Sequence, residues 1–175
     1  MRATSYVSCL LKSLLLTSDV LLALDFECLR RNCDYLFSLD SDVLVKPDII
    51  KNLISKEKDY VAGLLYNGYK VCPEKPEKYP NVLRLMADGQ YLHVLNSYTK
   101  NKKGIITCNF TGAVFLCSKK ALPFLKFDNH KLGEDLPACI SLEKNGFKVW
   151  CSCDDYCQHI MGKEYLEQFK NFPNY

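Results

Sequence analysis

Two aspartates separated by one residue are the first candidates for chemistry in this chain. Asp40-Ser41-Asp42 follows residues 34–39, which are mostly apolar or aromatic. In an extended segment, residues i and i+2 project to the same side, so we expect both carboxylates to lie together at a strand's end. Paired carboxylates suit Mg²⁺ or Mn²⁺, which take their remaining ligands from phosphate and water. The plain alternative is two solvated acids where a strand meets a loop.

A second acidic site, Gly133-Glu134-Asp135, precedes an apolar segment that predicts a helix over residues 136–144. Carboxylates at a helix N-terminus are stabilised by the helix dipole, so the simplest role for this pair is capping. The functional interpretation makes Asp135 a general base that takes a proton from an acceptor hydroxyl.

A late histidine, His159, follows the strand predicted for residues 147–151. Its imidazole is a suitable ligand for a manganese-like ion. Lys163 would then pair with a diphosphate as a point charge. A zinc-binding interaction module is a rival, because cysteine and histidine are the usual zinc ligands. Its candidate ligands, whose spacing departs from the usual pattern for zinc, are Cys151, Cys153, Cys157 and His159.

Together these residues resemble the GT-A glycosyltransferases. Residues 34–45 are similar to the metal-binding strand of that family, and residues 109–113 to the strand that lines its acceptor site. Gly133-Glu134-Asp135, the following helix, Asn145-Gly146 and His159 look like the second half of bacterial family 2-type members. The resemblance covers residues 34–163 and rests on the order and spacing of these motifs.

The resemblance implies a metal-dependent, inverting transfer of sugar from a nucleotide-diphosphate sugar, expected to be UDP-linked, to a hydroxyl of a glycan, lipid or protein. The implied metal is Mn²⁺ or Mg²⁺. The metal ligands would be Asp42, Asp40 and His159, and the donor would contact Asp40, Ser41, Asp42 and Lys163. Asp135 would be the base, with the acceptor held by Glu134, Asn109, Thr111 and Gly112. A catalytically inactive remnant of such an enzyme is the alternative, because only residues 1–33 precede the first motif.

The elements that must position these residues alternate between strands and helices, which predicts an α/β domain. The resemblance adds a GT-A-like (Rossmann-like) mixed, mainly parallel sheet flanked by helices, which lacks part of its N-terminal nucleotide-binding half. We expect one domain over residues 1–175: an N-terminal helix in 1–33, a metal, donor and acceptor core in 34–163, and a C-terminal helix and tail in 164–175. Within the core, the sequence predicts strands at 34–40, 59–65, 111–117 and 147–151, helices at 49–55, 118–125 and 136–144, a loop at 67–80 and a hairpin at 82–96.

Composition narrows the classes of partner and location. The chain is 48% hydrophobic and carries a net charge of +3 without a basic block, so no nucleic-acid partner is expected. Lys12 and Asp19 interrupt the apolar run of residues 7–24, which argues against a transmembrane segment or secretory signal. Several of the ten cysteines lie within apolar stretches, where reduced cysteine behaves as a small hydrophobic residue. We therefore expect a cytoplasmic protein.

Overall fold

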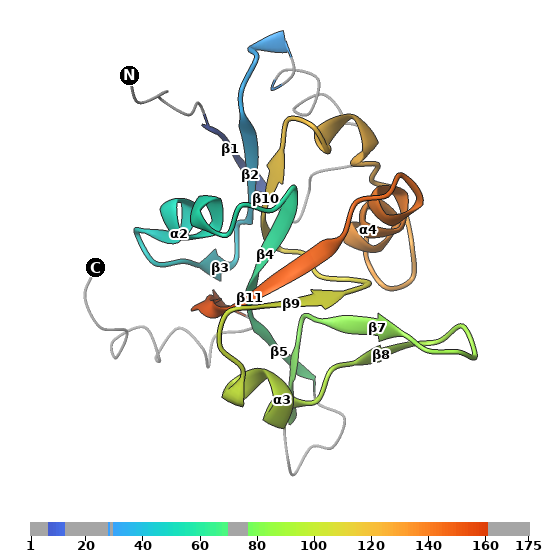
Figure 1. Ribbon diagram of the computed structural model, residues 1–175. Coiled ribbons are helices and arrows are strands. Elements are labelled where there is room, and N and C mark those ends of the chain that lie inside the picture. The colour runs from blue at the N-terminus through green and yellow to red at the C-terminus, as the bar shows by residue number, and fades with distance from the viewer. Residues whose placement is uncertain (1–6, 13–27, 29, 70–76, 161–175) are drawn as a thin grey trace.

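A six-stranded sheet forms the centre of the molecule (Figure 1). The computed structural model describes residues 7–12, 28, 30–69 and 77–160. The strand order is β1-β2-β10-β4-β11-β9. In that order the strands are β1 (Val7–Lys12), β2 (Tyr35–Asp40), β10 (Val114–Ser118), β4 (Tyr60–Leu64), β11 (Val149–Tyr156) and β9 (Ile105–Cys108).

The strand directions correct the expectation of a mainly parallel sheet. Parallel pairing joins β1 to β2 and β4 to β11, whereas β10 is antiparallel to both of its neighbours and β9 is antiparallel to β11. The sheet is therefore mixed and mainly antiparallel by its neighbouring pairs. The reason is the insertion of β10 between β2 and β4, two strands that themselves point the same way. Apolar strand segments carry no signal of direction, so the sequence did not reveal this insertion.

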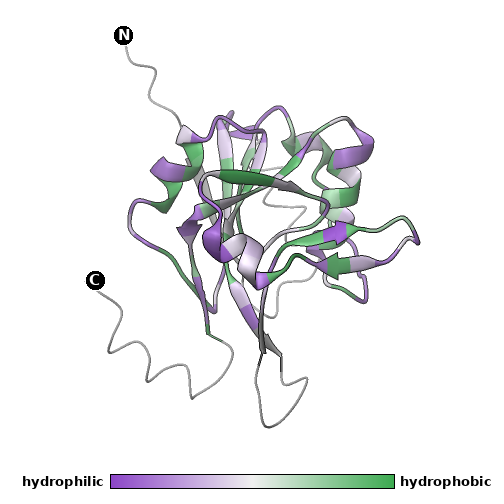
Figure 2. Cartoon of the chain, turned by 60° about the horizontal axis from the view of Figure 1, so that its bottom comes forward, coloured by the Kyte–Doolittle hydropathy of each residue, from purple (hydrophilic) through white to green (hydrophobic). Residues whose placement is uncertain are grey.

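Three small ladders lie outside the main sheet. β3 (Val43–Leu44) pairs with β12 (Gln158–His159), β5 (Tyr66–Tyr69) with β6 (Glu77–Pro80), and β7 (Leu83–Leu85) with β8 (Tyr91–His93). The β7–β8 hairpin projects from the body of the molecule beside the short helix α3 (Asn96–Asn101) (Figures 1 and 2). The predicted loop at 67–80 is thus wrong at both ends, where the chain forms β5 and β6.

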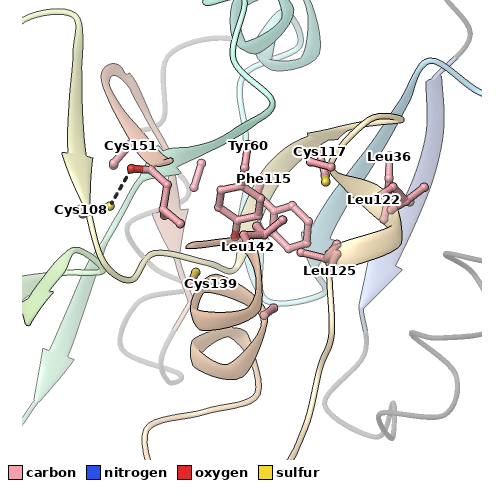
Figure 3. Close-up of a cluster of buried hydrophobic side chains, with 14 of the residues drawn as sticks. Leu36, Tyr60, Cys108, Phe115, Cys117, Leu122, Leu125, Cys139, Leu142 and Cys151 are labelled. Carbon is pink, nitrogen blue, oxygen red and sulfur yellow. Dashed lines mark hydrogen bonds between the residues drawn. The ribbon is translucent and has the colours of Figure 1, made fainter. Parts of the chain in front are cut away.

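Both faces of the sheet are covered, and each face has its own core cluster. Helix α2 (Ile49–Ser55) packs over one face, where Leu53 contacts a cluster that contains Phe37, Val61 and Leu116. Helix α4 (Asp135–Lys144) and the 3₁₀ turn η1 (Leu122–Phe124) cover the other face (Figure 3). That cluster includes Leu36, Tyr60, Phe115, Cys139 and Leu142. Neighbouring residues of the central strands enter opposite clusters, as strand alternation requires.

The N-terminal helix predicted for residues 1–33 is wrong at residues 7–12, whereas Cys28 and Arg30 are helical as expected. Residues 7–12 form β1, which lies parallel to β2 in a register from Val7 opposite Tyr35 to Lys12 opposite Asp40. A short apolar run does not distinguish a helix from a strand by periodicity alone, and here the open edge of β2 supplies a ladder partner. Residues 13–27 and the predicted C-terminal helix in 164–175 lie outside the described residues.

Local sequence signals placed several elements correctly. Helix α2 begins two residues after Pro47 and ends at Ser55 as expected, and α4 ends before Asn145-Gly146, where Gly146 has φ 83°. Gly89 has φ 81° in the turn of the β7–β8 hairpin. The helix expected at 118–125 is reduced to η1. None of the helices in the described part of the chain combines the length and hydropathy that a membrane span needs.

Candidate functional site

The Asp40-Ser41-Asp42 segment is a strand end followed by a turn. Asp40 is the last residue of β2, and Ser41 and Asp42 form the turn that leads into β3. The chain is therefore not extended through Asp42, which corrects the same-side argument. Instead, β3 pairs with β12, which sets Val43 opposite His159, and Ile160 N donates to Asp42 O at 2.7 Å. The turn thus directs Asp42 toward the strand that carries His159.

Asp42 and His159, two of the predicted metal ligands, are in direct contact. His159 Nε2 lies 3.0 Å from Asp42 Oδ2, and His159 Nδ1 lies 2.7 Å from Asn67 Oδ1. The side chains of Asp42 and His159 keep 29% and 18% of their exposure, so the pair is accessible from one side. Asn67 belongs to β5, and nothing in the sequence pattern singled it out. It fixes the imidazole orientation from the side opposite Asp42.

Asp135 is held close to the end of β2 through Ala113. The Asp135 carboxylate is almost completely buried at the start of α4, and its Oδ2 accepts a hydrogen bond from Ala113 N at 3.0 Å. Ala113 O in turn accepts from Asp40 N at 2.9 Å. The backbone of Ala113, whose φ is 68°, therefore connects Asp40 to Asp135 through two hydrogen bonds. Asp40 and Asp135 therefore lie at the same end of the sheet.

The predicted acceptor residues divide into two groups. Thr111 is fully buried, and its carbonyl accepts from Tyr60 Oη at 3.0 Å and from Cys139 Sγ at 3.3 Å. Asn109 accepts from Leu85 N and donates to Glu143 Oε1, each at 3.0 Å. The Thr111 carbonyl and the Asn109 side chain therefore make structural contacts here, whereas Gly112 lies against Asp135 and Glu134 is exposed. Contact with an acceptor stays a prediction for all four, and Lys163 lies outside the described residues.

A cavity of about 550 Å³ opens beside the Asp42–His159 pair. Asn67 joins the two, because it contacts His159 and also lines the cavity. Asn81, another lining residue, is buried; its Oδ1 accepts from Leu65 N at 3.0 Å and its Nδ2 donates to Gly112 O at 2.9 Å. The remaining lining residues are Tyr79, Leu83, His93, Phe110, Lys131 and Leu132. A second cavity, of about 570 Å³, is lined by Asn109 and Glu143, and neither cavity is lined by Asp40, Asp42 or His159.

The late cysteines do not assemble with His159. Cys151 belongs to the core cluster under α4, whereas Cys157 belongs to the cluster under α2, on the other face of the sheet. Burial raises the pKa of the Cys157 thiol to about 12, which disfavours the thiolate that zinc requires. Eight cysteines, among them Cys151, Cys153 and Cys157, are free thiols. The structure therefore gives no support to the zinc-binding module.

A two-residue ligand set remains at the end of β2. Among the residues that the structure describes, no three His, Cys, Asp or Glu side chains gather closely enough to hold an ion. Asp40 therefore does not complete a set with Asp42 and His159 in this conformation. Two ligands of an octahedral Mg²⁺, each at 2.0–2.1 Å, lie about 3 Å apart. The separation of 3.0 Å between His159 Nε2 and Asp42 Oδ2 is that of a hydrogen bond and is also compatible with that spacing.

Comparison with known proteins assigns no family and no function to the chain. No family model matches the chain, and no curated protein matches it. Among solved structures, the chain is similar to protein A197 from STIV, with 17% sequence identity and a TM-score of 0.49. The match covers 81% of this chain and 65% of that protein, so the chain spans less than two thirds of its length. The functional proposal is therefore carried by the site itself.

Proposed function

We propose that the chain is a metal-dependent glycosyltransferase of GT-A type, which transfers sugar from a UDP-linked donor to an acceptor hydroxyl. The contact between Asp42 and His159 carries this proposal. The sequence predicted both residues as metal ligands, although 117 positions separate them. His159 Nε2 lies 3.0 Å from Asp42 Oδ2, and both side chains are partly exposed. Their positions are set by β2, by the turn at Ser41-Asp42 and by the β3–β12 ladder.

The donor side of the site fits a divalent ion held by few protein ligands. Mg²⁺ is typically bound through one or two carboxylates, with the rest of its shell taken from substrate phosphates and water. When bound, the ion would neutralise the charge that develops on the departing nucleoside diphosphate. His159 must offer a lone pair at Nε2, so its proton must reside on Nδ1. Asn67 Oδ1, 2.7 Å from Nδ1, accepts that proton in a hydrogen bond and stabilises the required tautomer.

The acceptor side of the site is organised around Asp135. Its carboxylate is fixed by Ala113 N and borders Gly112, whose missing side chain leaves room for it. A base held in one orientation loses little entropy when it takes a proton from an acceptor hydroxyl. The cavity beside Asn67, of about 550 Å³, falls within the volume range of ligand sites and is the proposed place for the transferred sugar and the acceptor.

Calorimetric titration with UDP, with and without Mn²⁺, tests the donor site. We expect Mn²⁺-dependent binding by the native chain and a loss of about tenfold or more in Asp42→Asn and His159→Gln. Asp48→Asn is the matched control, because Asp48 is an exposed aspartate six positions further along the chain. A flat titration of folded native protein, or equal weakening in Asp48→Asn, would reject the donor site and favour an inactive remnant.

The base requires a separate measurement. Asp135→Asn should retain UDP binding but reduce sugar transfer by about a hundredfold or more, because general bases contribute on that scale. Transfer is measured from a panel of UDP-sugars to mixed acceptor hydroxyls, with Asp128→Asn as an exposed aspartate control. Unchanged transfer in Asp135→Asn would remove this residue from the mechanism.

A further inference from the structure

Large apolar side chains are exposed together on the β7–β8 hairpin and α3. The described residues contain seven exposed large hydrophobic side chains, and five of them fall between positions 85 and 98. They are Leu85 (47% exposed), Met86 (46%), Leu92 (50%), Leu95 (73%) and Tyr98 (42%), which we call the hairpin patch. Such clustering marks an interaction surface, whereas single exposed apolar residues do not.

The patch is continuous from the hairpin to the helix. Arg84 on β7 pairs in register with Leu92 on β8, so these two residues share one face of the hairpin. The Arg84 guanidinium lies 5.9 Å from the centre of the Tyr98 ring, which brings α3 against that face. Lys102 Nζ lies 5.8 Å from the same ring. Apolar and cationic groups are thus interleaved.

The hairpin and α3 carry mainly positive charge in sequence, and the Glu143 carboxylate of α4 lies near Arg84 and Tyr91. Residues 83–103 contain four cations and one carboxylate, that of Asp88 in the hairpin turn. The cations, all on exposed residues, are Arg84, Lys100, Lys102 and Lys103. Asp154, which reaches this region, already accepts from Gly104 N at 2.9 Å and pairs with Lys56 at 3.1 Å. The exposed cations are therefore complementary in charge to an anionic surface.

We propose that the hairpin patch docks the protein on an anionic lipid bilayer. The neighbouring pairs Arg84–Leu92 and Leu85–Tyr91 point to opposite faces of the hairpin, and Leu85 and Leu92 are both about half exposed. A flat protein partner covers one face of a hairpin, whereas immersion in the headgroup region covers both. Figure 2 shows hydrophobic and hydrophilic residues alternating along this projecting hairpin.

The side-chain types suit the lipid interface. Tyrosine places an apolar ring and a polar hydroxyl at the boundary, and lysine buries its stem while its charge stays at the lipid phosphates. The base of the hairpin is anchored in the body, because Val82 and Leu83 are buried and Val94 N donates to Val82 O at 2.9 Å. The tip can therefore enter the interface without unfolding. The proposal stands whether or not the chain transfers sugar.

Co-sedimentation with vesicles of phosphatidylcholine, with and without 30% phosphatidylserine, tests the docking surface. We expect binding to the anionic vesicles only. The combined variant Lys100→Gln, Lys102→Gln and Lys103→Gln should reduce partitioning by about a hundredfold, since each cation near an anionic surface contributes about fivefold. Leu92→Gln with Leu95→Gln should reduce it by a similar factor. Leu92→Trp should show blue-shifted fluorescence on vesicles, above the constant contribution of Trp150.

Matched variants elsewhere on the surface decide the result. Lys119, Lys126 and Lys144 are exposed lysines outside the patch, and Leu132 is an exposed leucine outside it. Changing the three lysines to glutamine, or Leu132 to glutamine or tryptophan, should leave partitioning and the spectral shift unchanged. Absent binding to anionic vesicles, or equal loss in the control set, would overturn the proposal. Loss of a dimer in sedimentation velocity on changing Leu92 and Leu95, without vesicle binding, would assign the patch to a second copy of the chain instead.

Discussion

At the scale of single residues, the position of Asp135 depends on the absence of a side chain at Gly112. A Cβ atom at position 112 would overlap the Asp135 carboxylate. The same carboxylate accepts from Ala113 N at 3.0 Å, and the Gly112 carbonyl accepts from Asn81 Nδ2 at 2.9 Å. The Gly112-Ala113 peptide is thus hydrogen-bonded to Asp135 at its N–H side and to Asn81 at its carbonyl side. A Cβ atom at position 112 must therefore displace one of these two side chains.

We predict that Gly112→Ala displaces Asp135. Overpacking of this kind typically costs about 1–3 kcal/mol, which urea unfolding will measure. Under the proposed function, sugar transfer should fall while Mn²⁺-dependent UDP binding persists, because Asp42 and His159 lie outside the clash. Gly89→Ala is the control: its φ is 81° but a Cβ there meets nothing within 4 Å, so it reports backbone strain alone. If both variants retain native transfer, Gly112 does not position the base.

The sequence predicted candidate site residues by chemical type, but it did not predict their arrangement. Asp42 and His159 were selected as metal ligands, yet their contact depends on the turn at Ser41-Asp42 and on the β3–β12 ladder. Asn67 and Asn81 were missed, because Asn67 lies in a predicted loop and Asn81 directly follows it, and an amide at such a position has no distinguishing pattern. Asn67 meets His159 across 92 positions of sequence, and such pairing is set by the whole fold.

At the scale of elements, α4 connects the candidate site at its start with a structural contact at its end. Glu143, in its last turn, accepts from Asn109 Nδ2 at 3.0 Å. Partial burial raises the pKa of the Glu143 carboxyl above its usual value of 4.5, although the hydrogen bond from Asn109 opposes the shift. The ionised form is thus disfavoured by folding. The Glu143 carboxyl group therefore contributes stability below its unfolded-state pKa, where it is protonated. This contribution is lost as the pH rises through the raised folded-state pKa.

Glu143→Gln should therefore stabilise the protein at neutral pH. Glutamine still accepts from Asn109 but carries no charge to desolvate. Solvent screens a half-exposed carboxylate, so we expect a gain below about 1 kcal/mol, or roughly 1–3 °C in Tm at pH 7.5. The gain should vanish near pH 4. Thermal unfolding monitored by circular dichroism across this range measures the trend. An equal trend in Glu57→Gln, an exposed control, would assign it to net charge rather than to position 143.

Elements with their own start and stop signals were predicted well, and elements defined by a partner strand were not. Pro47 before α2 and Asn145-Gly146 after α4 act locally, so those helices match the expectation. In contrast, β1 and β9 become strands through pairing with β2 and β11. The residues of β5 and β6 were assigned to a loop for the same reason, because their polar, proline-containing sequence gains order only as a hairpin.

At the scale of the whole molecule, the site lies where the ends of several strands converge. β2 finishes at Asp40, the antiparallel β10 begins just after Ala113, and β12 returns past Asp42. The insertion of β10 between parallel strands therefore brings Ala113 beside the end of β2, and Ala113 N donates to the Asp135 carboxylate at the start of α4. A sheet with the same elements in purely parallel order would separate Asp135 from Asp40. The mixed topology is what allows four distant segments to meet.

The last prediction concerns β1, which covers the outer edge of β2. Deleting residues 1–12 leaves the amides and carbonyls on that edge without their ladder, and an open edge strand tends to pair with another chain. We expect lower stability, concentration-dependent self-association in light scattering, and about tenfold or faster hydrogen exchange in residues 35–40. Deleting only residues 1–6 removes the chain before β1 and should change none of these. If the longer deletion remains monomeric with unaltered exchange, β1 is dispensable. If instead exchange rises and UDP binding falls together, the parallel β1–β2 ladder, with Lys12 opposite Asp40, also supports the donor end of the site.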